Sequence, residues 1–316
     1  MILFLSCATT SPPPTVSDTV AIEAPLPLPP EPEPEPEPEP LRSPEGVAML
    51  DCPETPREGM SCVPGGPYTR GTDEAHKCDQ YENIAQHTTV GPVQEIWVQS
   101  FYMDKTEVTY SAYQSCVQKG DCPPAKPSYS DYNRPNQPMV GLSWYAADTY
   151  CKAQDQFLPS EAQWEKAARG PDGAQTPFGL DTVSCEHAVV MNEDGRSCGT
   201  KKLKGSHPDK GRTWEVGLKP AGAYGLYDMV GNAEEWVSDW FSASWETCGD
   251  ACSGLDPLGP CGTAAKCSGH PLKMVKGGSW YWPAEHAKSW HRRPHVPSND
   301  PYHHFGFRCA ASLKSN

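Results

Sequence analysis

The chain has 316 residues, of which 35 are proline and 14 are cysteine, and its 26 basic and 40 acidic side chains give a formal net charge of −14. This acidic balance does not favour nucleic-acid binding, which requires a basic face that displaces phosphate counterions. The mean hydropathy is −0.62, and no apolar run reaches the ~18 residues that a membrane-spanning helix needs. The composition is therefore that of a globular protein, and the next question is where in the chain the excess proline lies.

The first ten residues are typical of an exported protein. An apolar stub, Met1 to Ser6, ends in Cys7, which is followed by Ala8. This pattern resembles the end of a bacterial lipoprotein signal, in which the cysteine is lipidated and becomes the mature N-terminus. The stub lacks a basic region and is shorter than the usual ~7–15 apolar residues, so a short leader, or none, is the alternative. We assign residues 1–10 to a signal remnant with Cys7 as lipid anchor, which predicts a bacterial envelope lipoprotein, membrane-anchored and of the outer membrane.

Residues 11–57 form the predicted linker. Residues 1–57 hold 15 of the 35 prolines, and their 10 acids and 2 bases carry −8 of the net −14. From Glu31 to Pro40, glutamate and proline alternate strictly. Proline lacks a backbone donor and the glutamates repel one another, so this tract cannot form a packed core. It is predicted to be a disordered, extended linker.

The remaining residues, 58–316, are predicted to form one loop-rich α+β domain. A strand is expected over residues 96–103, followed by a helix over 109–119. Ser143 precedes a second expected helix, and Ser160 opens a third over 161–168, where Gln163 completes a capping box and Gly170 follows the end. Elsewhere Gly, Pro, Asn and Asp dominate, so Trp and Tyr are expected to supply much of the core.

Thirteen cysteines besides Cys7 indicate an oxidising compartment. Local spacing favours loop-closing disulfides at Cys116 with Cys122 and at Cys185 with Cys198. A later group, Cys248, Cys252, Cys261 and Cys267, fits either disulfides or a zinc site, although its spacings differ from the short C-x2-C knuckles of most zinc modules. The odd number leaves one cysteine unpaired, and Cys52, Cys62 and Cys78 have the least determined partners.

Six motifs carry a family resemblance. They occur in this order: GMSCVPGG at 59–66, MDKTEVT at 103–109, LPSEAQWE at 158–165, GLYDMVGNAEEW at 225–236, KGGSW at 276–280 and GFRCA at 306–310. Together they resemble the formylglycine-generating enzyme (sulfatase-modifying factor) family over residues ~58–313. The resemblance implies a single compact domain related to C-type lectins, with little regular secondary structure.

The family's catalytic chemistry is not expected here. Formylglycine-generating members oxidise a sulfatase cysteine with oxygen and copper, and two thiolates after the Gly-Gly-Ser-aromatic motif bind that copper. The resemblance places these positions at Trp282 and Ala287, and no cysteine lies between Cys267 and Cys309. Because copper(I) requires soft ligands, copper is not expected and formylglycine generation by the known mechanism is disfavoured.

The resemblance also implies one disulfide, between Cys151 and Cys309. A second family disulfide has lost both partners, because one position is Ala168 and the other falls near Arg292.

A calcium site is implied in the loop that precedes Trp236. Asp228 and Glu235 can offer carboxylates, and Gly231 and Ala233 can offer carbonyls, which are the hard oxygens that calcium prefers. These positions match a structural calcium site of the family, with Asp228 where asparagine is usual. The alternative is a rigid turn that docks Trp236. Another family calcium site, around residues 189–195, has poor side-chain agreement and is not carried over.

Two further clusters have open alternatives. Five histidines lie beside Arg292 and Arg293, and they form either a metal site or a polar rim: His286, His291, His295, His303 and His304. Trp280, Trp282 and Trp290 either line a recess for a sugar or peptide or pack in the core.

The preferred functional hypothesis is a surface-tethered, non-catalytic binding or structural module of the cell envelope. Its partner is an unidentified protein or glycan, and it contacts the membrane through the lipid anchor and no nucleic acid. The alternative is an oxidoreductase of the same family that acts on a protein or small molecule with non-standard metal ligands.

Overall fold

The computed structural model describes residues 39–73, 91–127, 130–200, 211–298 and 303–313. Cys7, most of the predicted linker and Cys78 lie outside them. Contacts separate residues 1–39 from a unit of residues 40–316, which holds every element below. In the described part, no helix combines the length and apolarity needed to cross a membrane.

Short strands and helices alternate with long loops along this unit. The strands are β1 (Met60–Val63), β2 (Gly66–Arg70), β3 (Gln94–Val98), β4 (Phe101–Asp104), β5 (Glu234–Trp240), β6 (Lys273–Lys276), β7 (Arg293–His295), β8 (Phe305–Gly306) and β9 (Ala310–Ser312). The α-helices are α1 (Tyr110–Lys119), α2 (Trp144–Ala153), α3 (Glu161–Arg169) and α4 (Trp245–Cys248). Three 3-10 turns complete the set, η2 (Ala223–Gly225), η3 (Gly249–Cys252) and η4 (Ala284–His286).

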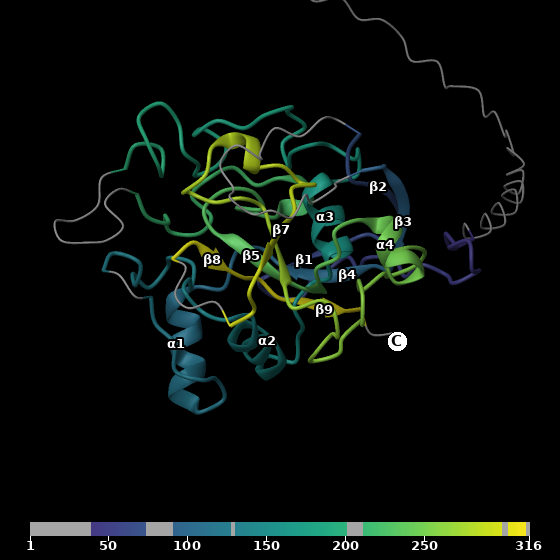
Figure 1. The fold of residues 1–316 in the computed structure, drawn as a ribbon, viewed down its shortest axis with the longest axis horizontal. Helices are drawn as coiled ribbons and strands as arrows, with labels where there is room; N and C mark the ends of the chain where they lie inside the picture. Colours follow the sequence, from purple (N-terminus) through teal and green to yellow (C-terminus); the bar gives the residue numbers. More distant parts are fainter. Residues whose placement is uncertain (1–38, 74–90, 128–129, 201–210, 299–302, 314–316) are drawn as a thin grey trace, which may run out of the picture. The chain divides into compact units, whose positions relative to one another are not determined.

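The strands form three small sheets. One has the order β1-β4-β9, one pairs β2 with β3, and a four-stranded sheet has the order β7-β6-β5-β8, in which only the β5–β8 pair is parallel. Because β9 pairs with β4, the C-terminal end of the described chain joins strands from the start of the domain. In Figure 1, α1 and α2 lie below the sheets and long loops cover the upper part. The predicted loop-rich α+β fold is confirmed.

The strand predicted over residues 96–103 is divided in two. β3 and β4 belong to different sheets, and Gln99 and Ser100 separate them. The Gln99 amide donates to Asp256 Oδ1 over 2.8 Å, while the Ser100 hydroxyl bonds to the carbonyl of Leu50 and accepts from the amide of Gly65. The break arises because distant groups take the hydrogen bonds that a continuous ladder would have used.

The three predicted helices are present, and the predicted caps at Ser143 and Ser160 are formed; Thr109, predicted as the first helical residue, is instead the N-cap of α1. Thr109, Ser143 and Ser160 each accept a backbone N–H in the first turn. Ser160 and Gln163 form a reciprocal capping box, and Gly170 follows α3 with a φ of 70°, a left-handed value that glycine adopts without strain. Each of these helix ends is set by hydrogen bonds to residues three or four positions away in the sequence.

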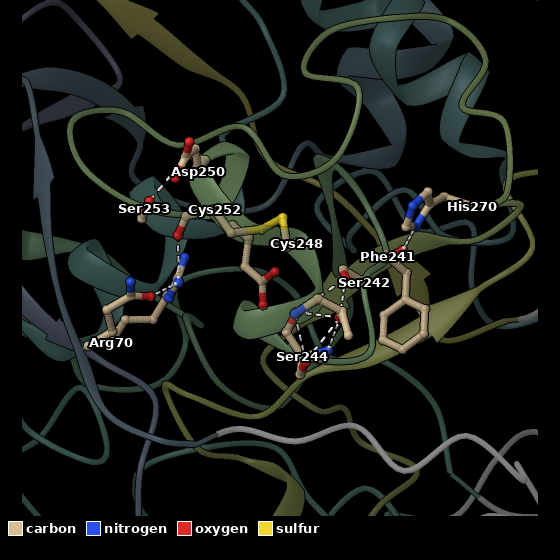
Figure 2. The surroundings of a disulfide bond; sticks show 12 residues. Arg70, Phe241, Ser242, Ser244, Cys248, Asp250, Cys252, Ser253 and His270 are labelled. Atoms are coloured by element: carbon tan, nitrogen blue, oxygen red, sulfur yellow. Dashed lines mark hydrogen bonds between the residues drawn. A yellow bond between two sulfur atoms is a disulfide. The ribbon is translucent and has the colours of Figure 1, made fainter.

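All twelve cysteines of the described residues form disulfides. The pairs are Cys52–Cys62, Cys116–Cys122, Cys151–Cys309, Cys185–Cys198, Cys248–Cys252 and Cys261–Cys267. The pair implied by the family resemblance, Cys151–Cys309, is therefore formed, and it ties α2 to the segment before β9. The zinc alternative is wrong, because its four cysteines are bonded to one another in two pairs. Figure 2 shows the surroundings of the Cys248–Cys252 disulfide, where the Arg70 guanidinium donates to the carbonyl of Cys252 over 2.6 Å.

Charged side chains lie within the core beside α3. Glu165 is fully buried, and it accepts from Arg169 Nε at 2.9 Å, from Lys276 Nζ at 3.1 Å and from the amide of Gly71 at 2.8 Å. Burial by itself raises the pKa of Glu165, but Lys276 and Arg169 outweigh it and lower that pKa to about 2. The ionised carboxylate therefore stabilises the folded state.

We predict that Glu165→Gln destabilises the protein by about 3–5 kcal/mol at neutral pH, because Arg169 then keeps a buried charge without its carboxylate. Denaturant unfolding followed by tryptophan fluorescence measures this loss. Because the folded pKa lies below the ordinary value of 4.5, the advantage of the wild type is complete above that value and disappears as pH falls towards about 2. Glu246→Gln, at an exposed position, serves as the control. A difference that does not change between pH 7 and such acid conditions contradicts the prediction.

Candidate functional site

The loop that carries the predicted calcium ligands is held tightly at its centre. Gly231 has a φ of 79°, and a Cβ there would lie 2.8 Å from the carbonyl oxygen of Val189. The Gly231 amide donates to the carbonyl of Gly277, and the Asn232 amide donates to that of Val189, both over 2.9 Å. The positive φ and the close backbone approach explain why glycine occupies this position.

The acidic side chains of this loop are buried. Asp228 is 5% exposed, and its Oδ2 accepts the amide of Gly217 over 2.6 Å. Glu235 is 1% exposed, and its two oxygens accept from Nε and Nη2 of Arg308, each over 2.7 Å. The indole of Trp164 also donates to Glu235 Oε2. Glu235 is therefore the counter-ion of Arg308 as well as a predicted ligand.

Glu107, at the end of the MDKTEVT motif, joins this cluster and was missed by the sequence analysis. The side-chain Nδ2 of Asn232 donates to Glu107 Oε1 over 3.0 Å. The buried Oε2 of Glu107 has no hydrogen-bond partner among the described residues. Burial and the neighbouring charge of Asp228 raise its pKa well above the ordinary value. Burial also raises the pKa of Asp228, against the amide of Gly217. No local pattern signals the contact between Glu107 and Asn232, because the two residues are 125 positions apart in the sequence.

The acids of this cluster outnumber its cations. Glu107, Asp228 and Glu235 interact with one another and with Arg308, and Asp228 also interacts with Lys219. The raised pKa values of Glu107 and Asp228 favour their protonated forms, so both would ionise fully only beside a further positive charge, such as a divalent cation. Among the described residues, no three His, Cys, Asp or Glu side chains converge as a ready metal cluster. A cation here would thus rely on loop carbonyls, such as those of Gly231 and Ala233, in addition to carboxylates.

Trp282 and Ala287, the positions that the family resemblance assigns to the copper ligands, both pack against neighbouring side chains. Ala287 is fully buried in the main apolar cluster. The Trp282 ring stacks on the His286 ring at 5.2 Å between centroids, and the Arg293 guanidinium lies 4.8 Å from the Trp282 ring centroid. Around Trp282 and Ala287 the described neighbours are therefore aromatic, aliphatic and cationic groups.

Three of the five histidines are buried, and His295 and His303 are partly buried. His286, His291 and His304 are 1%, 3% and 3% exposed, and the His286 and His291 rings meet edge to face at 4.8 Å. Burial and the charge of Arg293 lower the pKa of His304 well below its ordinary value, so it is neutral at pH 7. The absence of a three-ligand cluster in the described part gives no support to a histidine metal site.

The neighbouring arginines hold the same segment to the core. Arg292 makes a two-pronged ion pair with Glu161 at the start of α3, at 2.7 and 3.1 Å, and Arg293 binds Glu234 at 2.8 Å. Ala168, the other position of the missing family disulfide, is fully buried on the same helix. An ion pair therefore links α3 to the segment of Arg292, which the lost disulfide would also have joined.

The three tryptophans divide between the two alternatives. Trp280 and Trp290 are 0% and 3% exposed and belong to the interior, whereas Trp282 is only partly buried. The core explanation therefore holds for Trp280 and Trp290.

Comparison with known proteins agrees with this geometry. Residues 48–313 match the sulfatase-modifying factor enzyme 1-like domain. A formylglycine-generating enzyme of Thermomonospora curvata is 34% identical over 200 residues, which cover 60% of this chain and 60% of that enzyme, less than two thirds of its length. The Bos taurus enzyme is 26% identical over 311 residues, with 81% of this chain and 75% of the enzyme covered.

Solved structures show the same fold. PvdO from Pseudomonas aeruginosa superposes with a TM-score of 0.61 at 23% identity, over 80% of this chain and 94% of that one. Treponema denticola variable protein 1 gives a TM-score of 0.56 at 18% identity, over 80% of this chain and 95% of that one. With a sequence match that spans most of the domain and a shared fold, the chain belongs to the family of sulfatase-modifying factor enzyme 1-like proteins.

Proposed function

We propose that this protein is a non-catalytic binding or structural module of the cell envelope, tethered through a lipid on Cys7. One observation carries the loss of catalysis: the positions of the copper thiolates hold Trp282 and Ala287. The twelve cysteines of the described residues are all consumed in disulfides, so that part of the chain offers no thiolate pair to copper(I). The partner is a protein or glycan of the envelope.

An oxidoreductase is the second candidate, because relatives at 34% and 26% identity are named formylglycine-generating enzymes. It would act on a protein or small molecule with metal ligands other than the thiolate pair. The partly exposed Trp282 and the adjoining imidazoles of His286 and His304 are the groups nearest to that family position.

We predict that the purified protein neither retains copper nor converts a cysteine-containing sulfatase peptide to an aldehyde, because soft ligands are missing at the family position. Elemental analysis after incubation with copper(I) measures the metal, and hydrazide trapping with mass spectrometry measures the aldehyde. The Thermomonospora curvata enzyme, treated in parallel, is the positive control. Stoichiometric copper together with peptide aldehyde would favour the oxidoreductase and overturn the binding module.

Calcium is the second part of the proposal. Full ionisation of Glu107 and Asp228, whose pKa values are raised in the folded protein, requires an added positive charge, and this supports a divalent cation held by Asp228 and the carbonyls of Gly231 and Ala233. Glu235 contributes while it neutralises Arg308. Calcium would screen the repulsion between the buried carboxylates and lock the loop that precedes β5; its part is structural, not catalytic.

We predict that calcium raises the unfolding temperature and that EGTA removes this effect. Saturation to about 100 times Kd should add about 2.7 kcal/mol to the free energy of unfolding. Asp228→Ala should abolish most of the shift, since it removes a carboxylate from the cluster. Asp239→Ala is the matched control, because Asp239 is also a buried acid, hydrogen-bonded to the amide of Glu161 and outside the loop. Equal calcium responses in the wild type and Asp228→Ala would argue against the site.

The anchor has its own test. Expressed in a bacterium with its native upstream region, the wild-type protein should fractionate with membranes and incorporate labelled palmitate. Cys7→Ser should release it from the membrane fraction, because the thiol that takes the lipid is gone. Cys7→Ser protein that stays lipid-labelled and membrane-bound would refute Cys7 as the attachment point.

A further inference from the structure

A cavity of about 330 Å³ lies between α2, the start of α3, strands β5 and β6 and the loop around residue 258. We call it the Lys273 cavity. Its apolar wall consists of Trp144, Phe157, Leu158 and Leu258. Neither Trp282, Ala287 nor the calcium loop contributes to its lining. The cavity is therefore separate from both sites considered above.

Lys273 at its wall is an unusual buried cation. The residue is 1% exposed, and its Nζ lies 3.8 Å from the ring centroid of Trp144 and 4.0 Å from that of Trp240. The same nitrogen donates to the carbonyl of Ser238 over 2.6 Å. Two indole faces and one carbonyl hold the ammonium group in place through cation–π and hydrogen-bond interactions.

Among the described residues, no carboxylate lies within ion-pairing distance of Lys273 Nζ, although the buried Asp239 and Asp148 interact with it electrostatically at longer range. Burial lowers the pKa of Lys273 to about 8, so the group is mostly charged at neutral pH. The acids of the lining are engaged elsewhere, because Asp148 pairs with Lys152 at 2.7 Å and Asp256 accepts from the amide of Gln99. A buried ammonium beside open volume is thus available to a negative group that enters the cavity.

We propose that the Lys273 cavity binds a small monocarboxylate whose apolar body packs on Trp144, Phe157 and Leu258. The carboxylate would accept a hydrogen bond from Lys273 Nζ, which has donors beyond the one given to Ser238. The volume suits a body of about one aromatic ring with a short chain, at the lower end of small-molecule pockets. This site goes beyond the proposed function and does not depend on calcium or on the missing thiolates.

The probe for the test is 3-phenylpropanoate, titrated into the full-length protein, with tryptophan fluorescence and calorimetry as readouts. We expect saturable one-to-one binding. The neutral isostere 3-phenylpropanamide should bind at least about tenfold more weakly, because it lacks the charge that pairs with the ammonium group. Equal binding of acid and amide, or no saturable binding of the acid, would overturn the proposal.

Variants locate the contact. Lys273→Met keeps the length and apolar stem and should weaken binding of the acid by at least about tenfold while binding of the amide changes little. Lys166→Met is the matched control, since Lys166 is also a buried lysine whose pKa burial lowers to about 8, and it donates to the carbonyl of Gly66 away from the cavity. Unchanged acid binding in Lys273→Met, or an equal loss in Lys166→Met, counts against the site.

Leu258→Glu provides a second variant in case Lys273→Met does not fold. Leu258 is 37% exposed at the cavity wall, so a polar group is tolerated there. The added charge should repel the acid and leave the amide nearly unaffected. Equal weakening of both probes would show that the cavity does not select for a carboxylate.

Discussion

Most of the domain depends on the hydrogen bonds that the buried guanidinium of Arg308 makes. It is fully buried and makes two hydrogen bonds to Glu235 of β5, while it also donates to the carbonyls of Asp104, Lys105 and Tyr227. A charge in the interior is tolerated only when its donors are satisfied. One side chain of the GFRCA motif thereby fixes the end of β4, the beginning of β5 and the start of the calcium loop relative to one another.

The same constraint organises the helix that lies behind this centre. The Trp164 indole bonds to Glu235, and Glu165 on the next position binds Arg169 and Lys276. A domain with short strands and long loops has little repetitive backbone bonding. Buried ion pairs and the Cys151–Cys309 disulfide, which spans 158 positions, supply the long-range connections that larger sheets supply in other folds.

The two candidate binding places differ in how charge is balanced. In the loop before β5, Glu235 is the counter-ion of Arg308, and burial raises the pKa values of Glu107 and Asp228. In the Lys273 cavity the ammonium rests on indole faces in place of a carboxylate. Ala287 and the stack of Trp282 on His286 belong to neither place, since both are held by packing.

Local features followed from the sequence alone. The caps at Ser143 and Ser160 depend on neighbours three residues away, and the ordered motifs identified the family and the disulfide between Cys151 and Cys309. Interactions between distant segments did not follow. The break at Gln99 depends on Asp256, the approach of Glu107 to the calcium loop spans more than a hundred residues, and the cavity at Lys273 needs walls from four elements. The sequence determines which chemical groups are present. The tertiary structure determines which of these groups lie together in the interior, because only folding brings distant segments into contact and removes them from water.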